Sequence, residues 1–413
     1  MLKILLLTQW FDPEPTFKGL IFAKELVKQG FKVEVLTGFP NYPGGNLYSG
    51  YKIKILDKEV HDNIEVTRVP LYPSHNKSAF LRILNYLSFC ISSIIYGIFT
   101  KKRVDIIYAY HPPLTVGIAA VILKYIWKIP VVYDVQDMWP DTLKATGMIK
   151  NKSLLSVVGL ICKWIYNSVD NIVVLSPGFK KLLVERHVPE NKIDVIYNWC
   201  AENEFNFSYN DKKISLTKTG IFHILFAGNM GKAQSLNSVL DAAEKLLQTA
   251  PGLFFVFLGS GVEVDLLKKN VSERSLKNVV FFPSVPMNEV GRFLYSADAL
   301  LVHLKKDPLF RITIPSKIQA YMAVGKPILM AVDGDAADLV RHSNSGILAE
   351  SDNPESIAEA AKTLLNVRKE ELNQMADNGK KYYKRNLSLQ SGVKKFCEVF
   401  YKAIKKSDSI KRL

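Results

Sequence analysis

Cysteine is scarce in this chain, which has four cysteines among 413 residues. They are Cys90, Cys162, Cys200 and Cys397, and no two of them form a C-x-x-C pair. This spacing argues against a zinc site. We expect four buried, reduced thiols, as is typical of a cytosolic protein. The apolar run Ile4–Leu7 is also too short for a signal-peptide core, because Gln9 and Asp12 follow it at once.

Several motifs of hydrolases and nucleotide-binding proteins are absent. The sequence contains no G-x-S-x-G elbow, no P-loop, no H-E-x-x-H and no short-period repeat. Two acidic pairs are present, Asp333-Gly334-Asp335 and Asp134-Val135-Gln136-Asp137. The first follows an apolar run where Gly334 is better explained as a turn residue, so we expect no bound metal.

No block of Lys and Arg with interleaved aromatic residues occurs, although the net charge is +15. The excess of positive charge is spread over both halves of the chain, which disfavours a nucleic-acid partner. It favours a phosphorylated substrate or an anionic membrane instead. A content of 48% hydrophobic and 23% charged residues is typical of a folded globular protein, and 413 residues exceed a single core.

One stretch, Ile221–Leu247, has the pattern of a phosphate-binding unit. Ile224–Ala227 is predicted as a buried parallel strand, and Gly228 and Gly231 allow a tight turn after it. Beyond Ser235 the apolar residues recur at helical spacing. The free N–H groups and the dipole of such a helix start favour phosphate, although an isolated Gly-x-x-Gly is a weak signal.

The N-terminal part of the chain has the same pattern. Strand Lys3–Thr8, loop Gln9–Gly19, helix Leu20–Gln29 and strand Phe31–Leu36 match the order seen around Gly228, where Leu253–Leu258 is the next strand. Two such starts predict an α/β protein with two Rossmann-like domains that face each other across a cleft.

We expect four segments in this architecture. They are a first domain at 1–199, a polar linker at 200–220, a second domain at 221–390, and a C-terminal helix at 391–413 that crosses back to the first domain. Within the first domain the pattern also predicts a short strand at Tyr51–Leu56 and a loop at Gln136–Gly147.

The most apolar segment, Phe80–Thr100, has three possible explanations. It carries no charge from Ile83 to Thr100, and Lys101-Lys102-Arg103 follows it, so its length is near the minimum for a membrane span. Polar residues dilute it, and a strand predicted at Asp105–Tyr110 comes next. We favour a buried helix that also contacts a membrane over a span or a core helix.

Two candidate site residues stand out on chemical grounds. Lys317 follows Ser316, the expected N-cap of a helix, and a cation in the first turn is opposed by the helix dipole unless an anion lies between them. A solvated lysine is the alternative. Arg311 and Lys232 are further cations that can reach such an anion. His111 ends a strand and precedes two prolines, where a site residue or a structural histidine is possible.

Taken together, seven motifs resemble the family 4 glycosyltransferases of GT-B fold. They are FDPEPTFKGLIFAKEL, LTGFPNYPGG, YHPPLTVG, YDVQDMWPDTLKATGM, FAGNMGKAQSL, FLGSG, and PSKIQAYMAVGKPIL with its following Asp333-Gly334-Asp335. The resemblance covers nearly the whole chain and is strongest to the bacterial capsule and O-antigen branch, including N-acetyl-fucosaminyl-type transferases.

The resemblance implies retaining transfer from a nucleotide-sugar, usually a UDP-sugar and here a UDP-N-acetyl-amino sugar, without an obligatory metal or other cofactor. The second domain holds the nucleotide and the first holds the acceptor, for which we expect a lipid-linked saccharide. Catalytic roles fall on His111, Lys317 and Lys232. The residues expected to bind substrate are Gly19, Asp137, Gly228, Asn229, Gly231, Gln234, Arg311, Ser316, Gln319, Gly334 and Asp335.

The chain departs from the family at one place. The wider family has two glutamates eight positions apart, and here Ile312 and Ala320 occupy the matching positions. Gln319 is the nearest polar side chain and is the candidate for contact with the ribose, so the identity of the nucleotide stays open.

Two other functions remain possible from the sequence. They are a UDP-sugar 2-epimerase of the same fold and a non-catalytic subunit that binds sugar nucleotides.

The apolar helix and the positive charge predict a cytoplasmic location on the inner face of an anionic membrane.

Overall fold

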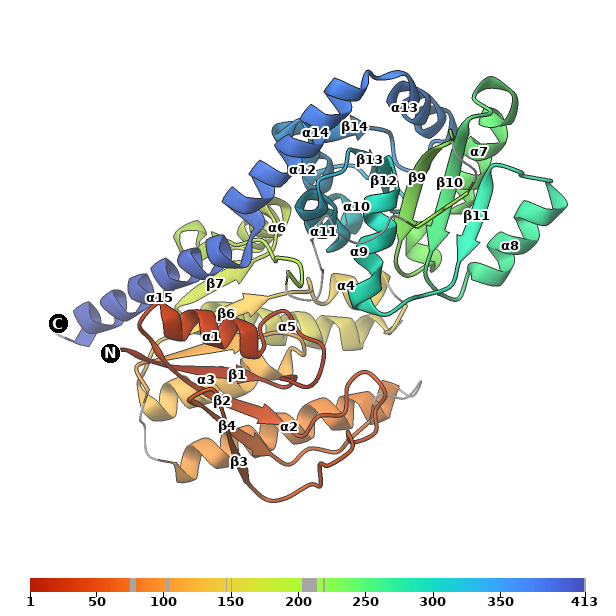
Figure 1. Cartoon of the computed structure of the whole chain (residues 1–413). Coiled ribbons are helices and arrows are strands. Elements are labelled where there is room, and N and C mark those ends of the chain that lie inside the picture. The colour runs from red at the N-terminus through yellow and green to blue at the C-terminus, as the bar shows by residue number, and fades with distance from the viewer. Residues whose placement is uncertain are drawn as a thin grey trace. The chain divides into compact units, whose positions relative to one another are not determined.

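The computed structural model describes residues 1–74, 79–100, 104–145, 147–149, 151–202, 214–217 and 220–411. The chain divides into two compact units (Figure 1). The first comprises Met1–Tyr197 with Gly392–Leu413, and the second comprises Asn198–Ser391. Most of the linker expected at 200–220 and the cluster Lys101-Lys102-Arg103 lie outside the described residues.

The first unit contains an eight-stranded sheet in the order β3-β4-β2-β1-β5-β6-β7-β8. Only the pairing of β3 with β4 is antiparallel. The order reverses between β1 and β5, and in open α/β sheets ligands bind at the carboxyl ends of the strands beside such a reversal. The strands are β1 (Lys3–Thr8), β2 (Lys32–Gly38), β3 (Asp57–His61), β4 (Ile64–Val69), β5 (Ile106–Tyr110), β6 (Val131–Val135), β7 (Asn171–Val174) and β8 (Ile193–Val195).

Helices cover both faces of this sheet (Figure 1). They are α1 (Leu20–Lys28), α2 (Ala79–Phe99), α3 (Thr115–Trp127), α4 (Asp141–Ala145), α5 (Lys152–Ser168), α6 (Pro177–Glu185) and α15 (Leu389–Lys411), with a 3-10 turn at Glu190–Lys192. On one face Phe22 of α1 and Phe396 of α15 pack against Tyr108 of β5, with ring centroids 5.5 Å and 5.3 Å away. On the other face Gly117 of α3 lies against Tyr133 of β6. The C-terminal helix therefore packs on the first unit, as predicted.

The second unit contains a six-stranded sheet that is wholly parallel, in the order β11-β10-β9-β12-β13-β14. Its strands are β9 (Phe222–Ala227), β10 (Leu253–Leu258), β11 (Val279–Phe282), β12 (Ala299–His303), β13 (Ile328–Ala331) and β14 (Gly346–Leu348). Its helices are α7 (Asn237–Thr249), α8 (Val264–Glu273), α9 (Met287–Ser296), α10 (Pro308–Arg311), α11 (Lys317–Val324), α12 (Asp335–Ser343), α13 (Pro354–Asn366) and α14 (Lys369–Tyr382), with short turns at Lys232–Gln234 and Tyr383–Leu387. The apolar strands form the core with α7 and α13.

Local sequence explains where several helices begin and end. Ser176 and Asn353 each accept a hydrogen bond from the backbone N–H three residues on, and each is followed by a proline at the first helical position. At the other end, Gly325 closes α11 in the left-handed conformation with φ +73°. The conformation of Gly325 therefore ends this helix.

Two predictions of local structure in the first unit are wrong. Tyr51–Leu56 is irregular, and β3 begins only at Asp57. The segment has no strand to pair with, because β3 itself takes the free edge of β4, and Ile55 is 91% exposed. The expected loop Gln136–Gly147 contains the short helix α4.

The apolar segment forms helix α2, which has one buried face and one exposed face. On the buried face the Asn85 side chain accepts a hydrogen bond from Gln9 at 2.5 Å and donates to the Tyr72 carbonyl at 2.7 Å. The other face carries exposed apolar side chains, namely Phe80, Ile83, Leu84, Leu87, Ile91, Ile95, Ile98 and Phe99. By length and hydropathy α2 is the one helix among the described residues that is able to cross a membrane. Its buried Asn85 shows that it is also part of the packed unit.

Candidate functional site

The glycine turn after β9 lies at the centre of the candidate site in the second unit. Gly228 has φ +131°, a conformation that side chains rarely adopt. A Cβ placed on Gly228 would lie 3.5 Å from Nζ of Lys317, the first residue of α11. The structure therefore brings together two residues that are 89 positions apart and that the sequence had assigned to one phosphate site.

The loop that follows β10 packs directly on this turn. A Cβ on Gly259 would lie 2.1 Å from the Gly228 carbonyl oxygen, and the Gly228 N–H donates to the Leu258 carbonyl at 2.9 Å. Any side chain at Gly259 would therefore displace the turn. The FLGSG motif thus acts as a support for the glycine turn.

Polar residues of the same turn also hold its shape. The Gln234 side-chain oxygen accepts a hydrogen bond from the Gly231 N–H at 3.0 Å and another from the Asn229 amide at 3.4 Å. The chain continues through a short 3-10 turn, and α7 begins only at Asn237. Helix α7 thus begins just beyond Ser235, as the sequence pattern predicts.

His303, at the end of β12, is a further residue of the candidate site, and the sequence analysis had not assigned it a role. It is fully buried, and its Nδ1 lies 2.6 Å from the Gln234 carbonyl oxygen, so Nδ1 must carry the hydrogen and donate. Burial lowers the pKa of His303, which keeps the ring neutral. The sequence feature that could have identified His303 is its position at the end of a predicted strand, because ligands bind at the carboxyl ends of parallel strands.

Lys317 is a half-buried residue whose ammonium lies in an apolar environment. Its Nζ lies 3.5 Å from the centroid of the Phe226 ring. Among the described residues it forms no ion pair, and burial lowers its pKa to about 7. An ammonium group that is desolvated, unpaired and placed against a glycine turn is suited to bind an anion.

The two polar neighbours of Lys317 differ in accessibility. Ser316 occupies the N-cap position as predicted, is exposed, and makes no side-chain capping bond. Gln319 is buried, and the amide orientation that satisfies its surroundings donates to the Ser316 carbonyl at 2.8 Å and the Pro315 carbonyl at 3.1 Å. Gln319 therefore stabilises the start of α11. This orientation of its amide does not favour contact of Gln319 with a ribose.

Gly334 places Arg311 next to the turn after β13. Gly334 has φ +76° and precedes α12, whose first residue is Asp335. A Cβ on Gly334 would lie 2.0 Å from the Arg311 carbonyl oxygen. Arg311 and Gly334 line a cavity of about 560 Å³. Lys232, in contrast, is simply exposed.

In the first unit His111 follows the carboxyl end of β5 and is buried. Its Nδ1 accepts a hydrogen bond from the Gln136 N–H at 3.4 Å, so Nε2 carries the hydrogen and is the donor. The ring packs edge-on against Trp139, with centroids 5.6 Å apart. Burial lowers the pKa of His111 to about 3, so the imidazole is neutral at every physiological pH.

Asp134, beside His111, is the centre of a buried polar network. It accepts hydrogen bonds from the Tyr108 hydroxyl at 2.5 Å and the Gln136 amide at 2.6 Å, and it forms an ion pair with Lys18 at 3.8 Å. Burial lowers the pKa of Lys18 to about 8 while the Asp134 charge opposes that shift. This network fixes Gln136, which in turn holds His111.

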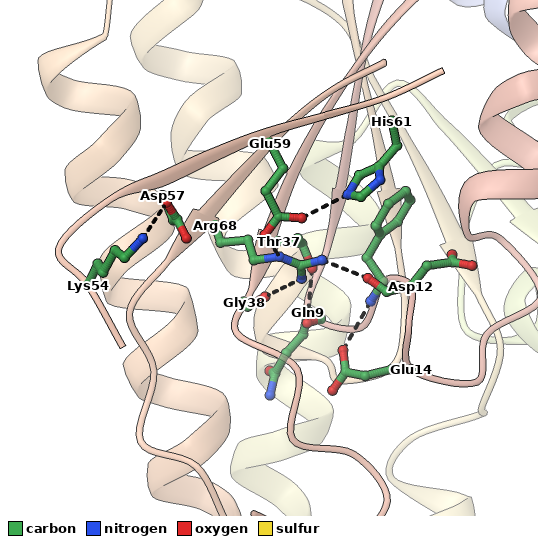
Figure 2. Close-up of polar contacts among 11 residues, drawn as sticks. Gln9, Asp12, Glu14, Thr37, Gly38, Lys54, Asp57, Glu59, His61 and Arg68 are labelled. Carbon is green, nitrogen blue, oxygen red and sulfur yellow. Dashed lines mark hydrogen bonds and ion pairs between the residues drawn. The ribbon is translucent and has the colours of Figure 1, made fainter. Parts of the chain in front are cut away.

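A second network joins the loops at the carboxyl ends of β1 and β2 (Figure 2). The Arg68 guanidinium, fully buried, donates to the Asp12 carbonyl at 2.6 Å, the Gly38 carbonyl at 3.0 Å and the Glu59 carboxylate at 2.8 Å. The Glu14 carboxylate accepts backbone N–H groups from Asn41 and from two further residues, Phe11 and Tyr42. Burial raises the pKa of Glu14 to about 7.

Gly19 and Asp137 occupy different settings at this edge. A Cβ on Gly19 would lie 2.1 Å from the Asp12 carboxylate, which accepts the Leu20 N–H at 2.6 Å. Asp12 therefore caps α1 and fills the space beside Gly19. Asp137 is half-buried, burial raises its pKa, and it makes no side-chain hydrogen bond or ion pair among the described residues.

The cysteines and acidic residues do not form a metal site among the described residues. All four cysteines are free and buried, as predicted. Within the part of the chain that the structure describes, no three His, Cys, Asp or Glu side chains group closely enough to hold a metal ion. The pair Asp333 and Asp335 flanks the turn at Gly334.

Two α/β domains, one with a wholly parallel sheet and one whose sheet is parallel apart from its edge strand β3, form the GT-B class of fold. Residues 22–199 match the family described as Glycosyl transferase 4-like domain. Residues 208–382 match the family described as Glycosyl transferases group 1. The chain therefore carries both of these glycosyltransferase domains, in this order.

Curated relatives of the chain have glycosyltransferase names. One is the probable glycosyltransferase WbjE of Pseudomonas aeruginosa, 27% identical over 57% of this chain and 59% of WbjE. Another is WcaI of Escherichia coli (strain K12), whose name assigns it to colanic acid biosynthesis as a glycosyl transferase. It is 26% identical over 78% of this chain and 82% of WcaI.

Solved structures show the same fold at low sequence identity. Anabaena HepE in complex with UDP has a TM-score of 0.70 and 15% identity, covering 97% of this chain and all of HepE. A trehalose 6-phosphate synthase of Burkholderia multivorans has a TM-score of 0.70 and 10% identity over 100% of this chain and 99% of that enzyme. These likenesses establish the fold.

The environment of Lys317 predicts a pH-dependent stability. Its pKa of about 7 in the folded protein lies below the ordinary 10.5, so below pH 7 the native state carries the full cost of a buried charge. Between pH 7 and 10.5 the unfolded state binds a proton that the native state lacks, and stability rises with pH. Without ligand, Lys317→Met should be more stable than the parent at pH 6, and the difference should shrink by pH 10.

Urea unfolding at several pH values measures this difference. The matched control is Lys232→Met, which removes an exposed lysine and should change little. A Lys317→Met protein that is less stable than the parent at pH 6 would contradict the assignment of Lys317 as an unpaired, desolvated cation.

Proposed function

We propose that the protein is a retaining, metal-independent glycosyltransferase. In this proposal it transfers a sugar from a UDP-sugar, with a UDP-N-acetyl-amino sugar as the expected donor, to a lipid-linked saccharide during synthesis of a surface polysaccharide. The two glycosyltransferase domains and the names of WbjE and WcaI support the activity and the pathway class. The UDP and UDP-glucose complexes of HepE support a UDP-sugar as donor.

The observation that carries the proposal is the unpaired Lys317 ammonium beside the Gly228 turn. When the bond between the sugar and the diphosphate breaks, negative charge develops on the leaving phosphate. A preorganised cation and backbone N–H groups stabilise that charge most in the transition state. Lys317 and the Gly228 turn thus bind the diphosphate, and the exposed Lys232 adds positive charge.

His111 has a different role in the proposed reaction. Because its Nδ1 accepts the Gln136 N–H, its Nε2–H is available to donate to a hydroxyl of the donor sugar. A neutral ring positions the sugar without adding charge. The acceptor hydroxyl attacks the anomeric carbon on the face that the phosphate leaves, and its proton passes to that phosphate.

The first prediction for this function separates these two roles. Lys317→Ala should lower the transfer rate by about a hundred- to a thousand-fold, roughly 3–4 kcal/mol, and should weaken UDP binding. His111→Ala should slow transfer while UDP affinity stays near that of the parent. Calorimetry with UDP on both variants tests the difference, and unchanged UDP affinity in Lys317→Ala would remove Lys317 from the phosphate site.

A second prediction concerns metals. If Lys317 and the glycine turn supply the positive charge, transfer should continue in EDTA. The assay follows UDP release with and without EDTA, then with added Mg²⁺ or Mn²⁺. Activity that disappears in EDTA and returns with either ion would instead assign Asp333 and Asp335 as metal ligands.

The proposed acceptor and location rest on the first unit. The exposed face of α2 is a continuous apolar surface, and such surfaces mark contacts with membranes or partners. The net charge of +15 favours an anionic membrane. Contact of α2 with the inner face of the cell membrane would give the first unit access to a lipid-linked acceptor.

A third prediction tests this membrane contact. Ile91→Ser with Ile98→Ser alters side chains that are 55% and 56% exposed, so the fold should be retained while binding to phosphatidylglycerol vesicles falls. Vesicle flotation measures this binding. The control pair Val262→Ser with Leu266→Ser removes exposed apolar side chains from the second unit. Equal loss from both pairs, or no loss from the α2 pair, would contradict contact through α2.

A further inference from the structure

The first turns of α2 lie at the edge of the sheet where the loops of the first unit's candidate site meet. The Asn85 side chain accepts a hydrogen bond from Gln9, directly after β1, and donates to the Asn41 side chain, after β2, at 3.2 Å. Both partners follow the carboxyl ends of their strands, as His111 follows β5. Asn85 therefore fixes this end of α2 beside the edge that carries His111.

Arg82 lies one turn before Asn85, on the same face of the helix. Its Nε atom is buried without a hydrogen-bond partner, and its guanidinium forms no ion pair among the described residues. Buried polar groups are nearly always hydrogen-bonded, so this exception needs an explanation. The first turn of α2 also contains no acidic residue, and the dipole of a helix start disfavours a cation there. An anion beside Arg82 would satisfy both the guanidinium and the helix start.

Two further polar side chains at this edge have no partner. The Tyr86 hydroxyl, one turn after Arg82, and the Asp137 carboxylate form no hydrogen bond or ion pair with any described residue. Burial raises the pKa of Tyr86, the Arg82 charge opposes this shift, and Tyr42 and Asp137 add to it. Because electrostatic effects weaken with distance, Arg82 and Asp137 both lie near the Tyr86 hydroxyl.

Arg82 and Asp137 do not compensate each other. Burial alone raises the pKa of Asp137, and no cation lowers it. Both side chains are half-buried. A cation and a carboxylate that lie near one hydroxyl without pairing can be satisfied by one occupant. That occupant must present a negative group to Arg82 and a hydrogen-bond donor to Asp137.

An apolar surface begins next to Arg82. Phe80, Ile83, Leu84 and Leu87 are exposed on the first turns of α2, and Phe80 is 72% exposed. An arginine at the border of such a surface is suited to the membrane interface, where phosphate groups lie above the hydrocarbon. Arg82 therefore borders both an apolar surface and the polar groups of the site.

We infer that Arg82 binds the phosphate that joins the acceptor saccharide to its lipid, while Asp137 accepts a hydrogen bond from a hydroxyl of that saccharide. The inference rests on the lipid-linked acceptor proposed above and names the groups that recognise it. A guanidinium donates parallel hydrogen bonds to phosphate oxygens, and the lipid lies on the exposed apolar face of α2. The Tyr86 hydroxyl bonds to the phosphate or to the saccharide.

Asp137 distinguishes this acceptor from a membrane phospholipid, which offers the same phosphate chemistry. A carboxylate close to the bound phosphate needs hydrogen-bond donors, and a saccharide supplies several hydroxyls. Gln136, the neighbour of Asp137, holds His111, so a saccharide at Asp137 is beside the proposed reaction site. Because Arg82 and Asp137 both act on the Tyr86 hydroxyl, the saccharide between them is short. The site thus favours an acceptor from an early stage of chain assembly.

Two matched probes in detergent test the inference with the full chain. One is N-acetylglucosamine linked to farnesyl diphosphate, and the other is farnesyl N-acetylglucosaminide, which has the same sugar and chain without phosphate. Calorimetry measures both affinities. The parent should bind the diphosphate probe roughly ten- to a hundredfold more tightly, because hydrogen bonds to a charged group contribute about that factor.

Variants assign the preference to single residues. Arg82→Gln should lower the affinity for the diphosphate probe to that of the phosphate-free probe, and Arg82→Lys should restore part of the preference. Asp137→Ala should weaken both probes by the same factor, since it acts on the shared saccharide. The control Lys128→Gln removes an exposed charge that precedes β6, at the opposite edge of the sheet, and should change neither affinity. Melting curves verify that each variant is folded.

Several outcomes would overturn the inference. One is an Arg82→Gln protein that keeps the parent's preference for the diphosphate probe. Competition by phosphatidylglycerol as strong as that of the diphosphate probe would assign Arg82 to a membrane phospholipid, and equally strong competition by inorganic diphosphate would make it an unspecific anion site. Measurement of UDP binding on the same samples separates the two proposals. A protein that binds UDP without any phosphate preference contradicts this inference alone, whereas loss of UDP binding as well contradicts the proposed transferase.

Discussion

The proposed function depends on one uncompensated charge, the Lys317 ammonium at the start of α11. Burial lowers its pKa to about 7, and among the described residues no carboxylate compensates it. The turn at Gly228 lies against it because Gly228 has no side chain. Much of the surrounding structure holds that turn: Gly259 supports it from β10, and His303 fixes the Gln234 carbonyl from β12. In the proposed function, the diphosphate of the donor compensates the charge of Lys317 and occupies the Gly228 turn.

In the first unit, buried ion pairs hold the loops of the candidate site in place. Its loops at the carboxyl ends of β1, β2 and β6 are irregular, and isolated loops of this kind would be mobile. Buried charges tie them to the sheet, since Asp134 with Lys18 and Arg68 with Glu59 would each be costly to separate. His111 is held through Gln136 by one of these networks. A neutral, oriented imidazole is the consequence.

Sequence patterns predicted the elements that depend on local signals. Strands such as Leu253–Leu258 are apolar throughout because both faces are buried, and Gly325 ends its helix through its own conformation. Lys317 was identifiable because a cation at a helix start conflicts with the dipole. The prediction of a strand at Tyr51–Leu56 was wrong because β3 occupies the free edge of β4, which leaves this segment no strand to pair with.

Residues defined by distant partners could not be predicted in this way. Lys18 and Asp134 lie 116 positions apart, and nothing in the sequence indicates their ion pair. His303 looked ordinary because its partner, the Gln234 carbonyl, is a backbone group of another strand's loop. Gln319 was assigned to the ribose by its place in the chain, whereas its amide is directed to the Ser316 carbonyl.

The most direct test of the central claim is the pKa of Lys317 itself, measured by NMR on protein labelled at the lysine side chains, with Lys317→Met for assignment. The proposed role of Lys317 predicts a pKa of about 7 in the free protein, and a rise of at least about one to two units when UDP binds, because a diphosphate favours the charged form. A pKa near the ordinary 10.5 that does not respond to UDP would contradict it.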